Sequence, residues 1–262
     1  SSLAKLFNSQ KELFCPQVNL SSGLLQDNEG DFRGEEDSPY LGEELNIKYP
    51  FSTSDKLVER AGKAFHVWRK TSVEDRAGIL IEALDRVKAR FFEMAYATMH
   101  TTGQGYMMAF QASGPHGNDR ALETIAAGFE EIKKFPEKAV WDKPMGKFNV
   151  TLDKEWKAIP KGVSVVIGCS TFPTWNTVPG MFASLITGNP VIIKPHPKAV
   201  YSIAIVVEEL QKVLLSADVN SRNNAKLMIN KSTDSYIEQV RITIEDTLGQ
   251  SLVNFKKEIR NE

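Results

Sequence analysis

Two short apolar runs, KGVSVVIG and GNPVIIKP, constrain the fold of this chain more than any other feature of its sequence. Each is bounded by glycine and proline, and each is followed by a helical pattern, at 177–187 and at 199–215. Continuous apolar runs of this length are typical of buried parallel strands. A third run, NAKLMIN at 224–230, extends the alternation. The pattern predicts an α/β fold with a partial Rossmann-like parallel sheet, the arrangement of dinucleotide-binding proteins.

Two apolar stripes at helical spacing predict amphipathic helices earlier in the chain. The first stripe consists of Leu57, Ala61, Ala64, Phe65 and Trp68. The second stripe consists of Leu80, Leu84, Val87, Phe91 and Met94. It follows Ser72-Val73-Glu74-Asp75, which resembles a capping box at a helix start. A further helix is expected at roughly 119–134, so we predict a helical amino-terminal portion beside the sheet.

Charge and cysteine usage exclude several partners. The formal net charge of the 262 residues is -1, so no basic field favours nucleic acid or an acidic membrane. The two cysteines, Cys15 and Cys169, make no disulfide framework and indicate a reducing compartment. The first residues, SSLAKLFNSQ, lack the apolar core of a signal peptide. We therefore expect a cytoplasmic protein with neither nucleic acid nor membrane as partner.

Changes in pattern along the chain predict its organisation. Residues 1–50 are polar and broken by Gly, Pro, Asn and Asp, and we expect a loose arm whose Glu35 and Glu36 lie on a solvated surface. Residues 138–160 mix Trp, Phe and Val with Pro and Gly, as in a long hairpin of the oligomerisation type. The expected segments are an arm at 1–50, a helical part at 51–137, a hairpin at 138–160, a partial dinucleotide-binding sheet at 161–234 and an amphipathic helix at 235–262.

The block at 162–197 carries a resemblance to a known family. Phe172-Pro173 ends a turn after the first apolar run, and Gly188-Asn189 and Lys194-Pro195 follow at fixed spacing. This order and spacing resemble the aldehyde dehydrogenases. The segments MHTTGQGYMMAFQASGPHGNDRALE, IGCSTFPTWN, FASLITGNPVIIKPHP and WDKPMGK are similar to the branch of the phenylacetic acid degradation protein PaaN. The similarity runs from about Ser38 to Leu215.

The resemblance implies an activity and an assembly. It implies NAD(P)-linked oxidation of an aldehyde, in this branch a semialdehyde from aromatic-acid or phenylacetate breakdown. A coenzyme A thioester is one candidate for this small-molecule substrate. In the family the hairpin pairs between subunits, so we expect a homo-oligomer.

The resemblance also implies which residues contact the cofactor. Gly168 ends the first strand, where a flat ring or a phosphate can approach closely. Ser170 and Thr171 follow in the turn beside the nicotinamide, and Lys194 ends the second strand, where it can donate to the adenosine ribose or to a 2′-phosphate. His196 adds possible positive charge. These five residues are the predicted cofactor-binding residues.

Departures from the family pattern shape the expected activity. The residue three positions after Lys194 is Pro197, where NAD-preferring relatives carry a ribose-binding glutamate, so we expect NADP rather than NAD. Thr171 occupies the position of the family's oxyanion-stabilising asparagine and is the candidate catalytic residue. No cysteine follows Cys169, which falls at the family's proline. We therefore expect the chain to stop before the catalytic nucleophile and base, and to bind a dinucleotide weakly, if at all.

Two functions remain open at this point. The chain is a truncated aldehyde dehydrogenase homologue that is inactive alone, or a non-catalytic module that binds a nucleotide or a protein partner. Smaller alternatives also stay open. His116 lies in a surface loop or near the substrate entrance, and Phe172 packs in the core or contacts substrate. The four histidines, His66, His100, His116 and His196, show no ligand spacing, so no metal site is predicted.

Overall fold

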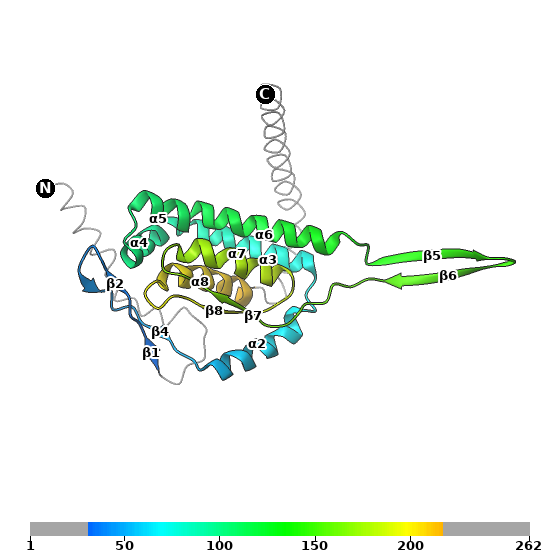
Figure 1. The fold of residues 1–262 in the computed structure, drawn as a ribbon, viewed down its shortest axis with the longest axis horizontal. Helices are drawn as coiled ribbons and strands as arrows, with labels where there is room; N and C mark the ends of the chain where they lie inside the picture. The colour runs from blue at the N-terminus through cyan, green and yellow to red at the C-terminus, as the bar shows by residue number, and fades with distance from the viewer. Residues whose placement is uncertain (1–30, 217–262) are drawn as a thin grey trace, which may run out of the picture. The chain divides into compact units, whose positions relative to one another are not determined.

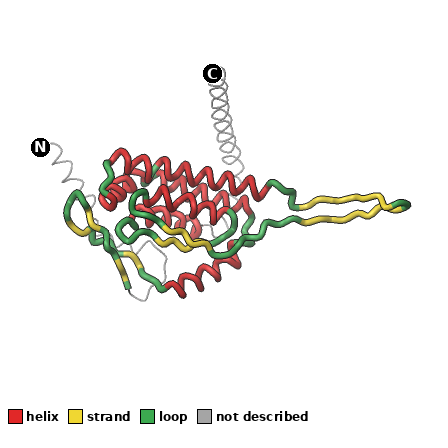
Figure 2. The backbone as a smooth tube through the Cα atoms, in the orientation of Figure 1, coloured by secondary structure: helices red, strands yellow, loops and turns green. Residues whose placement is uncertain are grey.

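Residues 31–216 are described by the computed structural model, which contains both helices and strands (Figure 2). The strand predicted at 224–230 and the amphipathic helix predicted at 235–262 lie outside the described residues. Within 31–216, the mixture of helices and strands confirms the predicted α/β class. No helix in this range is long and apolar enough to cross a membrane.

The segment before the first helix forms two small antiparallel pairs. Strand β1 (Phe32–Arg33) pairs with β4 (Tyr49–Pro50), and β2 (Asp37–Ser38) pairs with β3 (Glu43–Glu44). We expected residues 31–50 to belong to a loose arm, whereas the structure shows these two strand pairs there. The expectation that Glu36 lies on a solvated surface is wrong, because this residue is only 2% exposed.

Five helices follow in sequence (Figure 1): α2 (Ser54–Trp68), α3 (Val73–Lys88), α4 (Phe91–Thr102), α5 (Tyr106–Ser113) and α6 (Pro115–Lys133). Helix α3 begins where the capping box predicted, since Ser72 Oγ accepts from the Asp75 N–H at 3.1 Å. The second apolar stripe does not belong to one helix, however. The chain turns at Ala89 and Arg90, so Phe91 and Met94 lie on α4.

The predicted hairpin is confirmed. Strand β5 (Lys138–Met145) pairs antiparallel with β6 (Phe148–Glu155) through a turn at Gly146, whose φ of 68° suits glycine. Directly paired residues share a face of the ribbon, and one face carries the apolar pairs Trp141–Leu152 and Met145–Phe148. The hairpin is almost entirely exposed and projects from the helices in Figure 1.

The predicted pair of parallel strands is also present. Strand β7 (Ser164–Ile167) leads into α7 (Pro173–Ile186), and β8 (Val191–Lys194) pairs in parallel with β7 before α8 (Tyr201–Ser216). Gly188 follows α7 with a φ of 86°, a conformation that L side chains rarely adopt. Asn189 Oδ1 accepts from the Gly162 N–H at 3.0 Å and so ties together the starts of the two strands.

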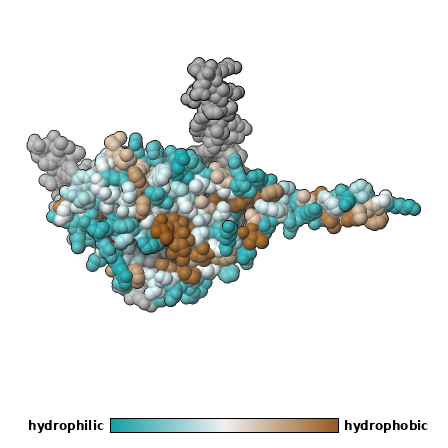
Figure 3. All heavy atoms as spheres, in the orientation of Figure 1, coloured by the Kyte–Doolittle hydropathy of each residue, from teal (hydrophilic) through white to brown (hydrophobic). Residues whose placement is uncertain are grey.

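The prediction that both strands are buried is wrong, because β8 is only half-buried and β7 alternates half-buried with exposed residues. Val165 is 62% exposed and Ile167 is 70% exposed. Val163 is exposed as well, and Figure 3 shows an apolar patch over the region of β7 and β8. Helix α7 packs on these strands, whereas among the described residues nothing covers the outward side chains of β7. A continuous apolar run therefore marks a strand here without showing that both faces are covered.

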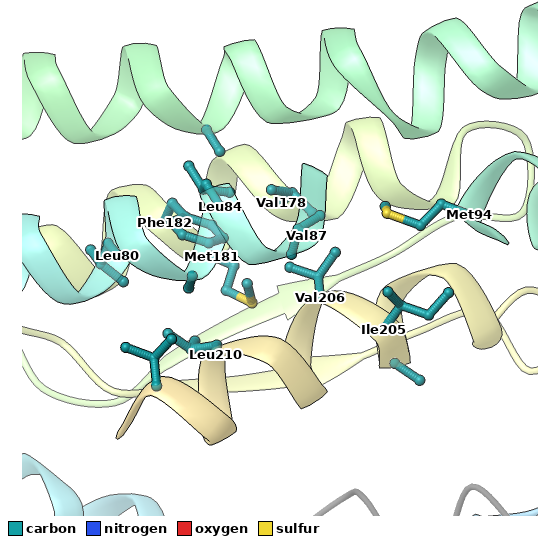
Figure 4. Close-up of a cluster of buried hydrophobic side chains, with 14 of the residues drawn as sticks. Leu80, Leu84, Val87, Met94, Val178, Met181, Phe182, Ile205, Val206 and Leu210 are labelled. Atoms are coloured by element: carbon teal, nitrogen blue, oxygen red, sulfur yellow. The ribbon is translucent and has the colours of Figure 1, made fainter. Parts of the chain in front are cut away.

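The core lies where α3, α7 and α8 meet (Figure 4). Leu84 and Val87 come from α3, Phe182 from α7, and Ile205 and Val206 from α8. Each of these side chains is at most 2% exposed. Burial of such apolar side chains is the main favourable contribution to folding, so this core fixes α7 and α8 beside the strand ends.

Candidate functional site

The carboxyl ends of β7 and β8 lie side by side. Ile167 pairs with Lys194 in the parallel register, and the Gly168 N–H donates to the Lys194 carbonyl at 2.9 Å. In open α/β sheets, ligands bind outside the carboxyl ends of the strands. The structure therefore brings together two of the residues that the sequence selected, Gly168 and Lys194.

Gly168 has a packing reason to be glycine. It is buried, and a Cβ at this position would lie 2.7 Å from Thr177 Oγ1 and 3.4 Å from Pro195 Cα. The first distance is shorter than real Cβ atoms show, and the second, to backbone, is at the lower limit of ordinary van der Waals contact. Glycine thus permits close packing of α7 and the β8 end on β7, in addition to any approach by a ligand.

The turn at 169–172 is held by α7 on one side. Asn176 Nδ2 donates to the Phe172 carbonyl at 3.1 Å and to Cys169 Sγ at 3.3 Å. The sequence did not show whether Asn176 reaches this turn, and the structure places it there. Cys169 is a free thiol of intermediate exposure whose recorded polar neighbour is this amide.

A second side chain reaches the same turn from the loop before α5. Gln104 Nε2 donates to the Thr171 carbonyl, while Ser170 is half-buried and Thr171 is exposed. Sequence reasoning missed Gln104. The only local signal was its position between Gly103 and Gly105, which marks a loop between two helices.

Lys194 and His196 differ in how they are engaged. Lys194 is exposed, and within residues 31–216 its ammonium group has no ion-pair partner. His196 Nδ1 accepts from the Lys198 N–H at 3.2 Å, so the neutral ring carries its proton on Nε2. The structure thus leaves the Lys194 ammonium available at the strand end and orients the His196 ring.

The charge on Lys198 is already paired. Its Nζ lies 2.9 Å from Asp37 Oδ1. Hydrogen bonding and attraction between the two groups lower the pKa of Asp37 and raise the pKa of Lys198. Both side chains are exposed, so the pair adds little stability, but it compensates a positive charge close to His196.

Glu36 fixes the helix that follows β8. Its carboxylate accepts from the backbone N–H groups of Val200 and Tyr201, at 2.6 and 2.9 Å, and from the Tyr49 hydroxyl. The two amides belong to the start of α8, where N–H groups lack helical partners. Burial raises the pKa of Glu36, and these hydrogen bonds oppose that rise. The sequence carried no sign that a distant carboxylate caps this helix.

Histidines do not gather at the strand ends. His100 is buried on α4 with its Nδ1 2.8 Å from Ser38 Oγ, and burial lowers its pKa. His66 and His116 are exposed on other helices. In the range 31–216, no group of three or more His, Cys, Asp or Glu residues is arranged to hold a metal ion. The strand ends offer a glycine, hydroxyls, amides and a lysine beside Cys169 and His196.

Comparison with known proteins identifies the family. The model of the aldehyde dehydrogenase family matches residues 49–222. The chain belongs to the aldehyde dehydrogenase family. This confirms the resemblance at the level of the family, and with it a Rossmann-type fold of the kind that uses NAD or NADP.

Solved and curated relatives agree. A structure named NAD-dependent aldehyde dehydrogenase, from Burkholderia multivorans, is 46% identical with a TM-score of 0.72, over 74% of this chain and 35% of that chain. The NADP complex of an NADP-dependent glyceraldehyde-3-phosphate dehydrogenase from Bacillus halodurans shares the fold at 18% identity and a TM-score of 0.59, over 73% of this chain and 40% of that chain. A 1-pyrroline-5-carboxylate dehydrogenase of Bacillus licheniformis is 28% identical over 61% of this chain. This chain spans only 29% of the length of that relative.

Proposed function

We propose that this chain supplies the cofactor side of an aldehyde dehydrogenase and binds NADP, weakly, in preference to NAD. The observation that carries this proposal is the pairing of the strand ends, where Gly168 donates to the Lys194 carbonyl and leaves the Lys194 ammonium exposed. Bound there, NADP would supply the hydride acceptor for aldehyde oxidation. The cofactor-binding residues we propose are Gly168, Ser170, Thr171, Lys194 and His196.

The preference for NADP follows from charge. A 2′-phosphate is attracted by the Lys194 ammonium, which no carboxylate within residues 31–216 neutralises. The position three residues later is Pro197, which has no carboxylate to accept from ribose hydroxyls or to repel a phosphate. The Burkholderia relative, by contrast, is named as NAD-dependent, so the preference needs a direct test.

Calorimetric titration of the chain with NADP and with NAD tests the proposal. We expect NADP to bind more tightly, and Lys194→Ala to weaken NADP binding about tenfold, as loss of a hydrogen bond to a charged group does. Lys147→Ala, at the exposed hairpin turn, is the matched control and should change neither affinity. Tighter binding of NAD, or equal effects of the two substitutions, would contradict the proposal.

We propose that the chain by itself does not oxidise aldehydes. Cys169 contacts the neutral amide of Asn176, and a thiol becomes a good nucleophile when a base or a positive charge favours its thiolate. Thr171, at the family's asparagine position, brings only a hydroxyl toward an oxyanion. Steady-state assays with NADP and a panel of aldehydes should show no turnover above background. Turnover that persists in Cys169→Ala would overturn the proposal.

For the complete protein we propose an aldehyde or semialdehyde of aromatic-acid or phenylacetate breakdown as the substrate. The support is the similarity of the segments around 99–123 and 167–197 to the PaaN branch. The protein as it is expressed in its source cells should reduce NADP faster with an aromatic-acid-derived semialdehyde than with a linear aldehyde of equal length. The opposite order would remove this assignment and leave the family membership intact.

We also propose that the protein is a homo-oligomer that pairs through its hairpin. One face of β5 and β6 presents Trp141, Leu152, Met145 and Phe148, and Phe148 is 64% exposed. Exposed strand edges are normally blunted, covered or paired, and large exposed apolar faces mark interaction sites. Leu152→Asp should lower the mass measured by light scattering, whereas Asn149→Asp on the polar face should not. A monomeric wild-type protein would contradict this proposal.

A further inference from the structure

The loop at 103–105, between α4 and α5, approaches the candidate site from outside the 162–197 block. Gly103 ends α4 in the left-handed conformation, with a φ of 77°, and the next residue turns its side chain toward the strand ends. There Gln104 Nε2 donates to the Thr171 carbonyl. The contact links the helical portion of the chain to the turn that follows β7.

The acceptor determines the orientation of the Gln104 amide. A carbonyl oxygen only accepts hydrogen bonds, so the amide nitrogen of Gln104 must face Thr171. Gln104 Oε1 is then buried and has no hydrogen-bond partner among the described residues. The carbonyl belongs to the peptide unit that joins Thr171 to Phe172, the N-cap residue of α7. Holding that unit fixes the direction in which the Thr171 side chain leaves the turn.

The 103–105 loop is itself braced from behind. The Tyr40 hydroxyl lies 2.8 Å from the Gln104 carbonyl and 3.0 Å from the Gly103 carbonyl, within donating distance of both. The Tyr40 ring meets the His100 ring edge-on, with centroids 6.0 Å apart, and His100 contacts Ser38. The amino-terminal segment thus supports the backbone from which the Gln104 side chain extends.

We propose that Gln104 is a positioning residue that, braced by Tyr40, holds the 171–172 peptide unit and so orients Thr171 toward the bound nicotinamide cofactor. The role of Thr171 at the cofactor rests on the proposed function. The hydrogen bond from Gln104 to the Thr171 carbonyl does not, and it can be tested without a cofactor. Asn176, on α7, donates to the Phe172 carbonyl, and Gln104, in the loop between α4 and α5, donates to the Thr171 carbonyl. Two side chains, one from α7 and one from the 103–105 loop, thereby restrain one turn.

Three substitutions of Gln104 separate hydrogen bonding from shape. Gln104→Met keeps the length and removes the donor, Gln104→Glu keeps the shape and offers only acceptors, and Gln104→Lys restores an N–H donor on a side chain of similar reach. Gln111→Met, at an exposed position on α5, is the matched control. Tyr40→Phe keeps the ring against His100 and removes only the brace.

Two measurements report the result. Hydrogen exchange should show the amides at 170–172 exchanging about tenfold faster in Gln104→Met and Gln104→Glu, and at the wild-type rate in Gln104→Lys and Gln111→Met. The NADP dissociation constant should rise about three- to tenfold in the first two variants and recover in Gln104→Lys. Global stability should change little in Gln104→Met, because the substitution also removes an unpaired buried oxygen.

The outcomes are distinguishable. Unchanged exchange in Gln104→Met, or no recovery in Gln104→Lys, overturns the restraint. The effects of Tyr40→Phe and Gln104→Met should be less than additive, because both act on one contact, and full additivity also counts against it. If the wild-type chain binds no NADP, the proposed function fails, while exchange still decides whether Gln104 restrains the turn. Faster exchange without any change in NADP affinity shows a restraint that does not serve cofactor binding and overturns the positioning role.

Discussion

Helices α2 and α3 share an amphipathic sequence pattern and a similar length, but they differ in how completely their neighbours cover them. They contain 15 and 16 residues, and each carries an apolar stripe opposite a charged face. Helix α3 buries residues along its whole length, whereas no residue of α2 is fully buried. Helix α3 packs against α6, α7 and α8, while α2 approaches β8. An apolar stripe thus predicts a helix and its inner face, but not how completely neighbours cover that face.

Both helices are nevertheless attached to the same turn at the end of α7. Trp68 Nε1, on α2, donates to the Leu185 carbonyl at 2.9 Å. Arg76 Nε, on α3, donates to the Ile186 carbonyl at 2.9 Å, and Arg76 Nη1 donates to the Thr71 carbonyl at 2.8 Å. The two helices therefore differ in two ways. Helix α3 has buried core residues that α2 lacks, and its attachment to α7 uses the charged Arg76 in place of the neutral Trp68.

The largest expected difference is in the response to loss of a leucine. Leu84→Ala on α3 should lower the free energy of unfolding by about 3 kcal/mol, because it leaves a cavity in a close-packed core. Leu57→Ala on α2 should cost less than about 1 kcal/mol, since Leu57 is only half-buried. Urea denaturation of the two variants measures both values. Equal losses would show that α2 is packed as firmly as α3.

The next difference is in the polar attachments. Arg76→Met keeps the apolar stem and should lower the free energy of unfolding by about 2 kcal/mol, because two carbonyls lose a charged donor. Trp68→Phe removes one neutral donor and should cost about 1 kcal/mol. Thermal and urea unfolding should rank the variants in this order. A larger loss for Trp68→Phe would place the main attachment on α2.

A smaller difference is expected at the helix starts. Ser72→Ala should lower the free energy of unfolding by about 1 kcal/mol, because the Ser72 hydroxyl caps the Asp75 N–H. Thr53 occupies the same position before α2 but makes no capping hydrogen bond. Thr53→Ala should therefore change the unfolding free energy by no more than a few tenths of a kcal/mol. A reversal of these two values would mean that the recorded cap contributes nothing.

The smallest effect extends the comparison to α4 and depends on pH. Burial lowers the pKa of His100 below its ordinary 6.5, so the folded chain favours the neutral ring. Its contribution is fully present above 6.5 and is lost as the pH falls through the folded-state pKa. His100→Asn should therefore lose less stability than the wild type between about pH 7.5 and pH 5.5. An unchanged or steeper loss in the variant would contradict the burial of a neutral imidazole.

Local patterns in the sequence were sufficient for most of the elements. The Ser72 cap, the turn at Gly146 and the runs SVVI and VIIK each depend on residues within a few positions of one another. The site residues Gly168 and Lys194 were also accessible, because parallel strands place their carboxyl ends at one edge. The division of the Leu80–Met94 stripe into two helices was missed, since the turn at Ala89 and Arg90 has neither glycine nor proline.

The sequence by itself thus indicated α2, α3, α6, α7 and α8, the hairpin, the parallel pair and the family, but not α4 and α5 as separate helices. Only the tertiary structure showed that Glu36 caps α8, that Gln104 reaches Thr171 and that the outer face of β7 is exposed. Secondary structure follows from short-range periodicity and turn chemistry, which can be read along the chain. A buried carboxylate or a bridging amide depends on which distant segments approach one another. That approach is determined by how the whole core packs, and no local pattern encodes it.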